Sequence, residues 1–218
     1  MTATSNVLAA RQRLPLRLGV ASSLCLTLAV ACTPGNDSAS STGYRGRLLP
    51  QPRGKVDFTL TDTNGEPFDF RAKTDGYVTL VFFGYTYCPD VCPIHMANIG
   101  AVLRDFPFEL RQQFKVVFVT TDPDRDTPDR LRQWLDNFDR SFIGLWGSED
   151  EVNEIAVSLG LPASVKVETE DGGYAVGHSA SVMAFTKDNL AHITYPFGTR
   201  QADWAHDLPE LATETWGE

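Results

Sequence analysis

Two short apolar runs with a helical pattern between them restrict the fold more than any other feature of this chain. Residues 78–83 (VTLVFF) and 115–120 (KVVFVT) are rich in β-branched and aromatic side chains, which is typical of buried strands. Between them, residues 94–114 carry apolar side chains at helical spacing. Strand, helix and strand in this order predict one βαβ unit, in which the two strands lie parallel in an open α/β sheet.

The segments around this unit predict a thioredoxin-like fold. Residues 56–60 and 67–70 flank an Asn-Gly pair, which favours a tight hairpin turn, so we expect an N-terminal β-hairpin extension. The elements expected after the βαβ unit are, in order, a helix from Thr127 to Phe138, a strand over 142–146, a helix from Ser148 to Gly160, a hairpin of strands over 181–186 and 191–195, and a helix over 203–215. This order is that of an α/β, thioredoxin-like fold with inserted helix and hairpin elements.

The start of the chain predicts export. Residues 1–32 contain three arginines, no acidic residue and an apolar stretch that ends in Ala-Val-Ala-Cys. This stretch is short for a membrane span, and small residues before a cysteine resemble a bacterial lipoprotein signal. We therefore expect a lipoprotein-type signal peptide over 1–32 and a lipid on Cys32. Ala29 stands where such sites more often carry Leu, so ordinary cleavage or an uncleaved membrane anchor remain alternatives.

Composition divides the rest of the chain into a tether and a domain. Residues 33–54 are rich in Ser, Thr, Gly, Pro and Asn without apolar periodicity, which predicts a flexible tether. Residues 55–218 are enough for one domain with a full core and too few for two. The 19 basic and 28 acidic residues give a formal net charge of −9 without any run of Lys and Arg, so we expect no nucleic-acid partner.

Cys88 and Cys92 stand four residues apart, directly after the strand expected over 78–83. If a helix begins there, residues i and i+4 share a face, and both sulfurs point to one place at the carboxyl end of the strand. Open α/β sheets bind ligands at that edge, so we expect the pair to hold a soft metal ion or to exchange electrons. A structural disulfide is the alternative, although such bonds usually join segments far apart in sequence.

His178 is the best candidate for a third ligand among four histidines. It lies in a loop of small polar residues before the strand expected over 181–186, and in a thioredoxin-like fold that loop comes beside the first βα turn. His95 follows the cysteines on the same helix and is a weaker candidate, because it would point partly away. His192, in an apparent edge strand, and His206, in the last helix, are interpreted as structural or solvated.

Two sulfurs and one imidazole favour copper, because Cu(I) is soft and accepts three-coordinate thiolate sites. Zinc would normally require a fourth protein ligand or an open catalytic position. Asp122 follows the strand expected over 115–120 and is therefore expected to face the same edge as the cysteines. We expect its carboxylate to orient the ligands from outside, with an ordinary turn containing an Asp–Arg pair as the alternative. Tyr85 and Tyr87 are expected to belong to the core or to line the site.

Three segments together resemble the SCO/SenC copper-chaperone family: residues 85–93 (YTYCPDVCP), 122–127 (DPDRDT) and 178–181 (HSAS). The resemblance covers the chain from about Lys55 to its end. It implies a membrane-tethered, thioredoxin-like domain that binds one copper ion through Cys88, Cys92 and His178, the last at the start of the third segment. It also implies a role in assembling the dinuclear copper centre of cytochrome c oxidase.

The partners that the resemblance implies are the apo form of the copper-bearing oxidase subunit and an upstream copper donor. The implied location is the extracytoplasmic face of a bacterial membrane, reached through the lipid anchor. Gly177 departs from the family pattern, because many members place Asp before the histidine. The lipoprotein-type signal also replaces the transmembrane helix that other members use.

Two functions remain open for the same residues. A metallochaperone would accept copper on Cys88 and Cys92 and pass it on without chemical turnover. A thiol:disulfide oxidoreductase would instead use the two sulfurs to reduce the cysteines of a partner's copper site. A peroxiredoxin-like role is a weaker third. His178 separates the first two, because disulfide exchange needs no imidazole.

Overall fold

The computed structural model describes residues 43–216. The strands are β1 (Arg47–Gly54), β2 (Thr59–Asp62), β3 (Pro67–Asp69), β4 (Val78–Gly84), β5 (Phe114–Thr120), β6 (Ile143–Trp146), β7 (Val165–Glu168), β8 (Tyr174–Gly177), β9 (Ser181–Phe185) and β10 (Leu190–Pro196). The helices are α1 (Phe70–Thr74), α2 (Val91–Asp105), α3 (Phe108–Arg111), α4 (Pro128–Leu135), α5 (Glu149–Ser158) and α6 (Gln201–Thr213). The predicted signal peptide and Cys32 lie outside the described residues.

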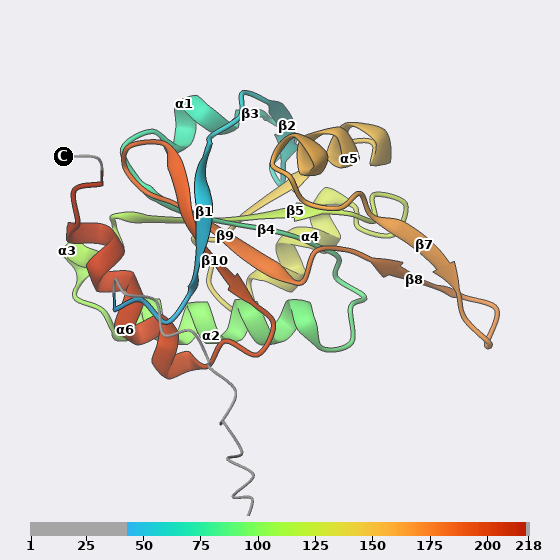
Figure 1. Cartoon of the computed structure of the whole chain (residues 1–218). Coiled ribbons are helices and arrows are strands. Elements are labelled where there is room, and N and C mark those ends of the chain that lie inside the picture. Colours follow the sequence, from blue (N-terminus) through green and yellow to red (C-terminus); the bar gives the residue numbers. More distant parts are fainter. Residues whose placement is uncertain (1–42, 217–218) are drawn as a thin grey trace, which may run out of the picture. The chain divides into compact units, whose positions relative to one another are not determined.

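An eight-stranded sheet in the order β1-β10-β9-β4-β5-β6-β2-β3 forms the centre of the fold (Figure 1). β4 lies parallel to β5 and β5 parallel to β6, whereas β9 is antiparallel to β4. The predicted βαβ unit, the hairpin β2–β3 and the hairpin β9–β10 are therefore confirmed. Together with α2, α4 and α6, these strands give the thioredoxin-like α/β fold that the sequence predicts.

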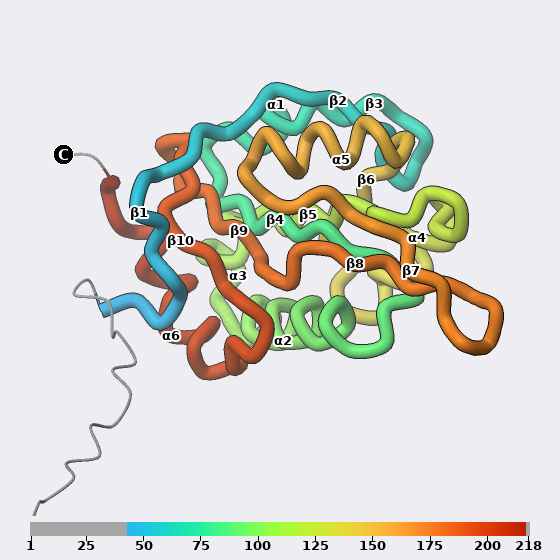
Figure 2. Tube along the Cα trace, turned by 45° about the vertical axis from the view of Figure 1, so that its right-hand side comes forward, coloured from blue at the N-terminus to red at the C-terminus, as the bar shows by residue number. Residues whose placement is uncertain are grey.

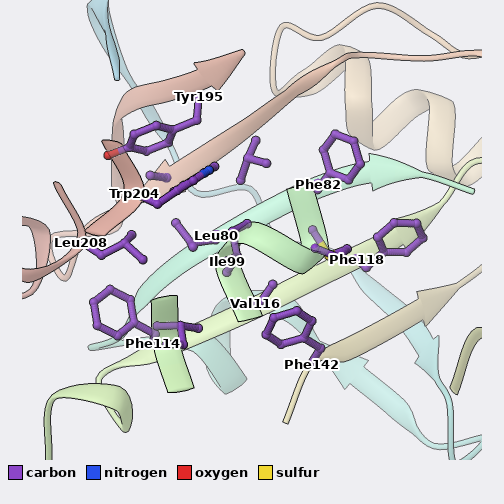
Figure 3. Close-up of a cluster of buried hydrophobic side chains, with 14 of the residues drawn as sticks. Leu80, Phe82, Ile99, Phe114, Val116, Phe118, Phe142, Tyr195, Trp204 and Leu208 are labelled. Atoms are coloured by element: carbon purple, nitrogen blue, oxygen red, sulfur yellow. The ribbon is translucent and has the colours of Figure 1, made fainter. Parts of the chain in front are cut away.

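Alternation along the central strands places a hydrophobic core on each face of the sheet. Leu80 and Phe82 of β4 point to the face covered by α2, α4 and α6, where Trp204 is fully buried (Figure 3). Val81 and Phe83 point to the other face, which α1 and α5 cover. The near-continuous apolar run of β4 thus reflects a strand that is buried on both sides.

The prediction of a flexible tether over residues 33–54 is wrong for its last eight residues, because β1 occupies Arg47–Gly54 (8 residues) and pairs antiparallel with β10. The pairing has a register shift between Leu48 and Arg53, and the strand contains two prolines, so its sequence carries no alternating pattern. The domain therefore begins before Lys55. The same pairing makes β10 an interior strand rather than the edge strand predicted around His192.

The carboxylate of Asp207 on α6 holds the chain just before β1. It is fully buried and accepts hydrogen bonds from the backbone amides of Arg45 (2.9 Å) and Gly46 (2.8 Å) and from the hydroxyl of Tyr195 (3.0 Å). A buried carboxylate is stable only when such donors surround it. Asp207 therefore fixes the entry of the chain into the sheet.

Three further elements, α1, β7 and β8, were not predicted. α1 follows β3, and β7 and β8 form a two-stranded antiparallel hairpin that has no ladder to the main sheet. This hairpin, which we call the β7–β8 arm, projects beyond the main sheet in both views (Figures 1 and 2). None of the helices within residues 43–216 combines the length and the apolar run that crossing a membrane requires.

We expect Asp207→Ala to lower the free energy of unfolding by about 3 kcal/mol or more, because it leaves several buried donors without an acceptor. Urea denaturation of the two proteins measures this difference. Asp203→Ala on the same helix removes a carboxylate paired with the exposed Arg200 and should cost no more than about 1 kcal/mol. Equal losses in the two variants would contradict the role assigned to Asp207.

Candidate metal centre

The two cysteines occupy the turn from β4 into α2, but they do not share a helix face as the sequence predicted. α2 begins at Val91, after Asp90, whose side chain caps the Val91 amide. Cys88 therefore lies in the turn before the helix, and Cys92 lies in its first turn. The backbone amide of Cys92 is 3.5 Å from the Cys88 sulfur, so an otherwise unpaired amide at the helix N-terminus faces that sulfur.

His178 comes to the same place from the connection between β8 and β9. Its Nε2 lies 3.5 Å from the Cys92 sulfur, and its Nδ1 donates to the Ser179 carbonyl oxygen at 2.9 Å. Because Nδ1 faces this carbonyl, Nε2 is the ring nitrogen that faces the sulfurs. The rings of Phe82 and Tyr85 meet the imidazole edge to face, at 5.7 and 5.6 Å between centroids, and hold its plane.

The ligand atoms of Cys88, Cys92 and His178 all lie within 4.8 Å of one another. Metal bonds to sulfur and nitrogen are about 2.0 to 2.3 Å, as they are for zinc, so one ion can contact all three atoms after small adjustments. Both cysteines are free thiols. Cys92 is fully buried and Cys88 keeps 8% of its surface exposed. The structure thus brings together the three predicted ligands, and His178 is the most exposed of them.

The two thiols have very different pKa values because their surroundings differ. The hydrogen bond with Cys92, helped by the His178 imidazole and two backbone amides, lowers the pKa of Cys88 to about 4 against the effect of burial. Burial raises the pKa of Cys92 far above its ordinary value, and the neighbouring Cys88 adds to this. At neutral pH the metal-free pair therefore holds one thiolate, on Cys88, and one proton, on Cys92.

The other three histidines do not join this group. His95 is buried on α2, contacts the Ala180 carbonyl oxygen through Nε2 at 3.1 Å and packs against Phe82. Burial lowers the pKa of His95, so its ring stays neutral and donates to that carbonyl. His192 pairs with an aspartate on the β9–β10 turn, and His206 pairs with its neighbour on α6.

Asp122 lies just after β5 as predicted, but its carboxylate is not one of the three clustered ligand groups. One of its oxygens accepts from Arg125 Nε, and the other accepts from the Tyr174 hydroxyl at 2.8 Å. An indirect role of Asp122 toward the metal ligands stays a prediction. The Asp–Arg pair of the alternative interpretation is present.

Asp126, which the sequence interpretation passed over, binds the cysteine loop directly. Its buried carboxylate accepts from the Thr86 amide (2.9 Å), the Thr86 hydroxyl (2.6 Å) and the Thr120 hydroxyl (2.7 Å). It therefore ties the loop that precedes Cys88 to the end of β5. Nothing in the run of acids over 122–127 distinguishes Asp126, because its partner Thr86 is 40 residues away.

Gly84 is a second missed residue, and its role is steric. A Cβ at this position would lie 2.7 Å from the Cys92 sulfur and 2.9 Å from the Phe82 ring, closer than real Cβ contacts. Only glycine at the end of β4 therefore lets the Cys92 side chain pack where it does. Gly177 is different, since an added Cβ would meet only the Val165 carbonyl oxygen, at 3.6 Å. Space alone does not explain the glycine before His178.

The difference in thiol acidity is measurable by alkylation. In the metal-free reduced protein we expect iodoacetamide to modify Cys88 at a nearly constant rate from pH 8 down to about pH 5, because its pKa is about 4. Cys92 should stay unmodified, as it is protonated and buried. Peptide mass spectrometry over a pH series reports both rates. A Cys88 rate that falls tenfold per pH unit below pH 8 would contradict the assignment of the thiolate.

The steric role of Gly84 predicts that Gly84→Ala lowers the free energy of unfolding by about 1 to 3 kcal/mol, because the added methyl group must displace Cys92 or Phe82. Gly177→Ala places the same group at an ordinary contact distance from the Val165 carbonyl oxygen and should change stability by no more than about 0.5 kcal/mol. Urea denaturation of both variants makes the comparison. If they are equally stable, the packing of Cys92 does not depend on Gly84.

The sequence of this chain is similar to those of known copper-related proteins. A family model described as SCO1/SenC matches residues 48–213. A Stutzerimonas stutzeri protein named as a candidate copper-binding protein is 34% identical over 177 residues, which are 78% of this chain and 86% of the relative. A SCO2-like protein of Rickettsia prowazekii is 34% identical over 136 residues, which are 60% of this chain and 63% of the relative.

Two solved structures of Sco proteins are also similar to this chain in fold and sequence. Copper-bound ScoI of Bradyrhizobium japonicum is 33% identical, with a TM-score of 0.64, over 73% of this chain and 99% of that chain. Apo Sco1 of Thermus thermophilus is 30% identical, with a TM-score of 0.68, over 77% of this chain and 96% of that chain. Because the family model spans most of the sequence, the chain belongs to the SCO1/SenC family.

Proposed function

We propose that this protein is a metallochaperone that binds one copper ion through the sulfurs of Cys88 and Cys92 and Nε2 of His178. The observation that carries the proposal is the gathering of these three atoms, from two separate segments, within 4.8 Å of one another. Copper is the cargo of such a protein and not a resident catalyst.

The chemistry of the ligand set favours copper over zinc. Two sulfurs and one imidazole suit Cu(I), which is soft and accepts three ligands. No fourth His, Cys, Asp or Glu joins the group within residues 43–216, whereas a structural zinc site would need one. The copper bound to the similar Bradyrhizobium protein supports the same choice.

Exposure decides from which side a partner can approach. Cys92 is fully buried and Cys88 keeps 8% of its surface exposed, while His178 is half-buried, so the accessible side of the group is that of His178 and the edge of Cys88. A thiolate or imidazole of a partner can therefore replace the ligands on the accessible side while Cys92 still holds the ion. Because Cys88 carries the thiolate of the metal-free pair, it is the group whose negative charge attracts an incoming ion.

The recipient in this proposal is the apo copper-bearing subunit of cytochrome c oxidase, whose dinuclear site the protein loads or prepares. This part of the proposal rests on the resemblance to the SCO/SenC family. A lipid on Cys32 and a tether that ends before β1 would hold the domain at the extracytoplasmic face of a bacterial membrane. This arrangement rests on the sequence of residues 1–32.

One observation favours a second function, thiol:disulfide exchange with the cysteines of a partner's copper site. Cys88 has a depressed pKa, as an attacking thiolate needs, and keeps 8% of its surface exposed, whereas Cys92 is fully buried and could resolve the mixed disulfide. The attacking thiolate would displace one sulfur of the partner's disulfide. Cys92 would then attack Cys88 and release the reduced partner.

We expect His178→Ala to weaken anaerobic Cu(I) binding by more than about 100-fold. Losing a metal ligand should reduce affinity more than losing a neighbouring group that only orients a ligand, which typically costs about 10- to 100-fold. Titration against a Cu(I) chelator gives the affinity and the stoichiometry, which should be one ion per chain in the parent. Exchange of the two thiols with a dithiol should persist in the variant, because it needs no imidazole.

His206→Ala is the matched control, since its ring is 46% exposed and far along the sequence from the cysteines. It should leave copper affinity unchanged. If His178→Ala binds copper as tightly as the parent, the ligand assignment is wrong. If the parent binds no copper but exchanges rapidly with a dithiol, the oxidoreductase is the better account.

A further inference from the structure

The segment that leads into His178 is not fixed by backbone pairing to the main sheet, whereas β9, which follows His178, pairs with β10 from Ser181 on. The β7–β8 arm leads directly into His178, yet β7 and β8 pair only with each other. Side-chain contacts must therefore set where the arm lies relative to the cysteine loop. Some of these are the ion pairs of Lys166 with Asp124 and Glu149, whose groups are 31 to 69% exposed, and exposed pairs contribute little.

Arg125 makes the more buried connection to the arm. Its Nη1 donates to the Tyr174 carbonyl oxygen at 3.0 Å, and its guanidinium lies 3.8 Å from the centroid of the Tyr174 ring. The Tyr174 hydroxyl in turn donates to Asp122, which is also the ion-pair partner of Arg125. Arg125, Tyr174 and Asp122 thus form a closed set of contacts between β8 and the end of β5.

The same guanidinium reaches the cysteine loop. It lies 4.9 Å from the centroid of the Tyr87 ring, and Tyr87 immediately precedes Cys88. It also lies 5.7 Å from the centroid of the Tyr85 ring, which contacts the His178 imidazole. Its Nη2 is buried without a hydrogen-bond acceptor among the described residues, so the aromatic faces supply part of its stabilisation. One side chain therefore contacts both segments that provide metal ligands.

We infer that Arg125 is a positioning residue that holds the β7–β8 arm, and with it His178, against the cysteine loop. The inference rests on the ligand set of the proposed function. It also assigns a task to Asp122, whose carboxylate orients Arg125 and Tyr174. A planar guanidinium suits this position, because it binds a carboxylate and a carbonyl while it stacks on aromatic rings, which a lysine ammonium cannot do together.

The test compares Arg125→Met in two backgrounds, the parent and His178→Ala. In the parent, we expect Cu(I) affinity, measured anaerobically against a chelator, to fall about tenfold, the effect typical of groups that orient metal ligands. In the His178→Ala background the same substitution should change affinity by less than about twofold, because Arg125 acts through the imidazole. Equal losses in both backgrounds, or no loss in the parent, would overturn the inference.

A second measurement uses the metal-free protein. Hydrogen exchange of the amides over residues 174–181 should become faster in Arg125→Met, while exchange in α5 stays unchanged. Arg125→Lys keeps the charge and should also fail to restore slow exchange. Unchanged exchange over residues 174–181 in both variants would show that Arg125 does not hold the arm.

Arg132→Met is the matched control, because Arg132 also pairs with a carboxylate, on Asp136, and donates to a carbonyl, on Phe142, but within the α4–β6 region. It should change neither copper affinity nor exchange over 174–181, and a similar effect there would overturn the specific role of Arg125. If His178→Ala leaves affinity unchanged, the proposed ligand set fails. The exchange experiment on metal-free protein then decides alone whether Arg125 holds the arm.

Discussion

The packing of the Cys92 sulfur against the end of β4 is the constraint on which the rest of the site depends. Gly84 leaves the space that this sulfur fills, and Phe82, two residues earlier on the same strand, packs against His178. Burial keeps the Cys92 thiol protonated, and its hydrogen bond to Cys88 keeps the second sulfur ionised. The end of β4 and the start of α2 therefore together determine the acidity of both thiols.

Buried carboxylates and an arginine surround this centre and hold its loops. Asp126 fixes the loop before Cys88 to β5, while Asp122 and Arg125 connect the same region to β8. A site assembled from loops is precise only when the ligand-bearing segments are restrained by such contacts. Among the three clustered groups, Cys92 is fully buried, Cys88 is nearly so, and His178 is half-buried. This division suits a protein that must bind an ion and then release it.

Much of the fold was predictable because its central elements carry local patterns. The apolar runs of β4 and β5, which are buried on both sides, identify these strands within a few residues. The capping box at Ser148, which the structure shows with both hydrogen bonds, marks the start of α5 in the same local way. β1 and the β7–β8 arm were not predictable in this way. Both are fixed by distant partners, β10 and Asp207 for the first and Arg125 for the second.

The same distinction applies to the site. Cys88, Cys92 and His178 were candidates because few residue types bind soft metals and because the fold brings their segments together. The offset of Cys88 from the helix follows from the start of α2 after Asp90, whose side chain caps the Val91 amide. Gly84 and Asp126 escaped notice, since a missing Cβ and a single acid among several carry no local pattern that reveals their contacts.

X-ray absorption of the reduced protein, loaded anaerobically with one equivalent of Cu(I), tests the central claim most directly. The account predicts two sulfur atoms and one nitrogen atom bound to copper, with the nitrogen signal lost when His178 is replaced. A spectrum of sulfur ligands alone in the parent would contradict it.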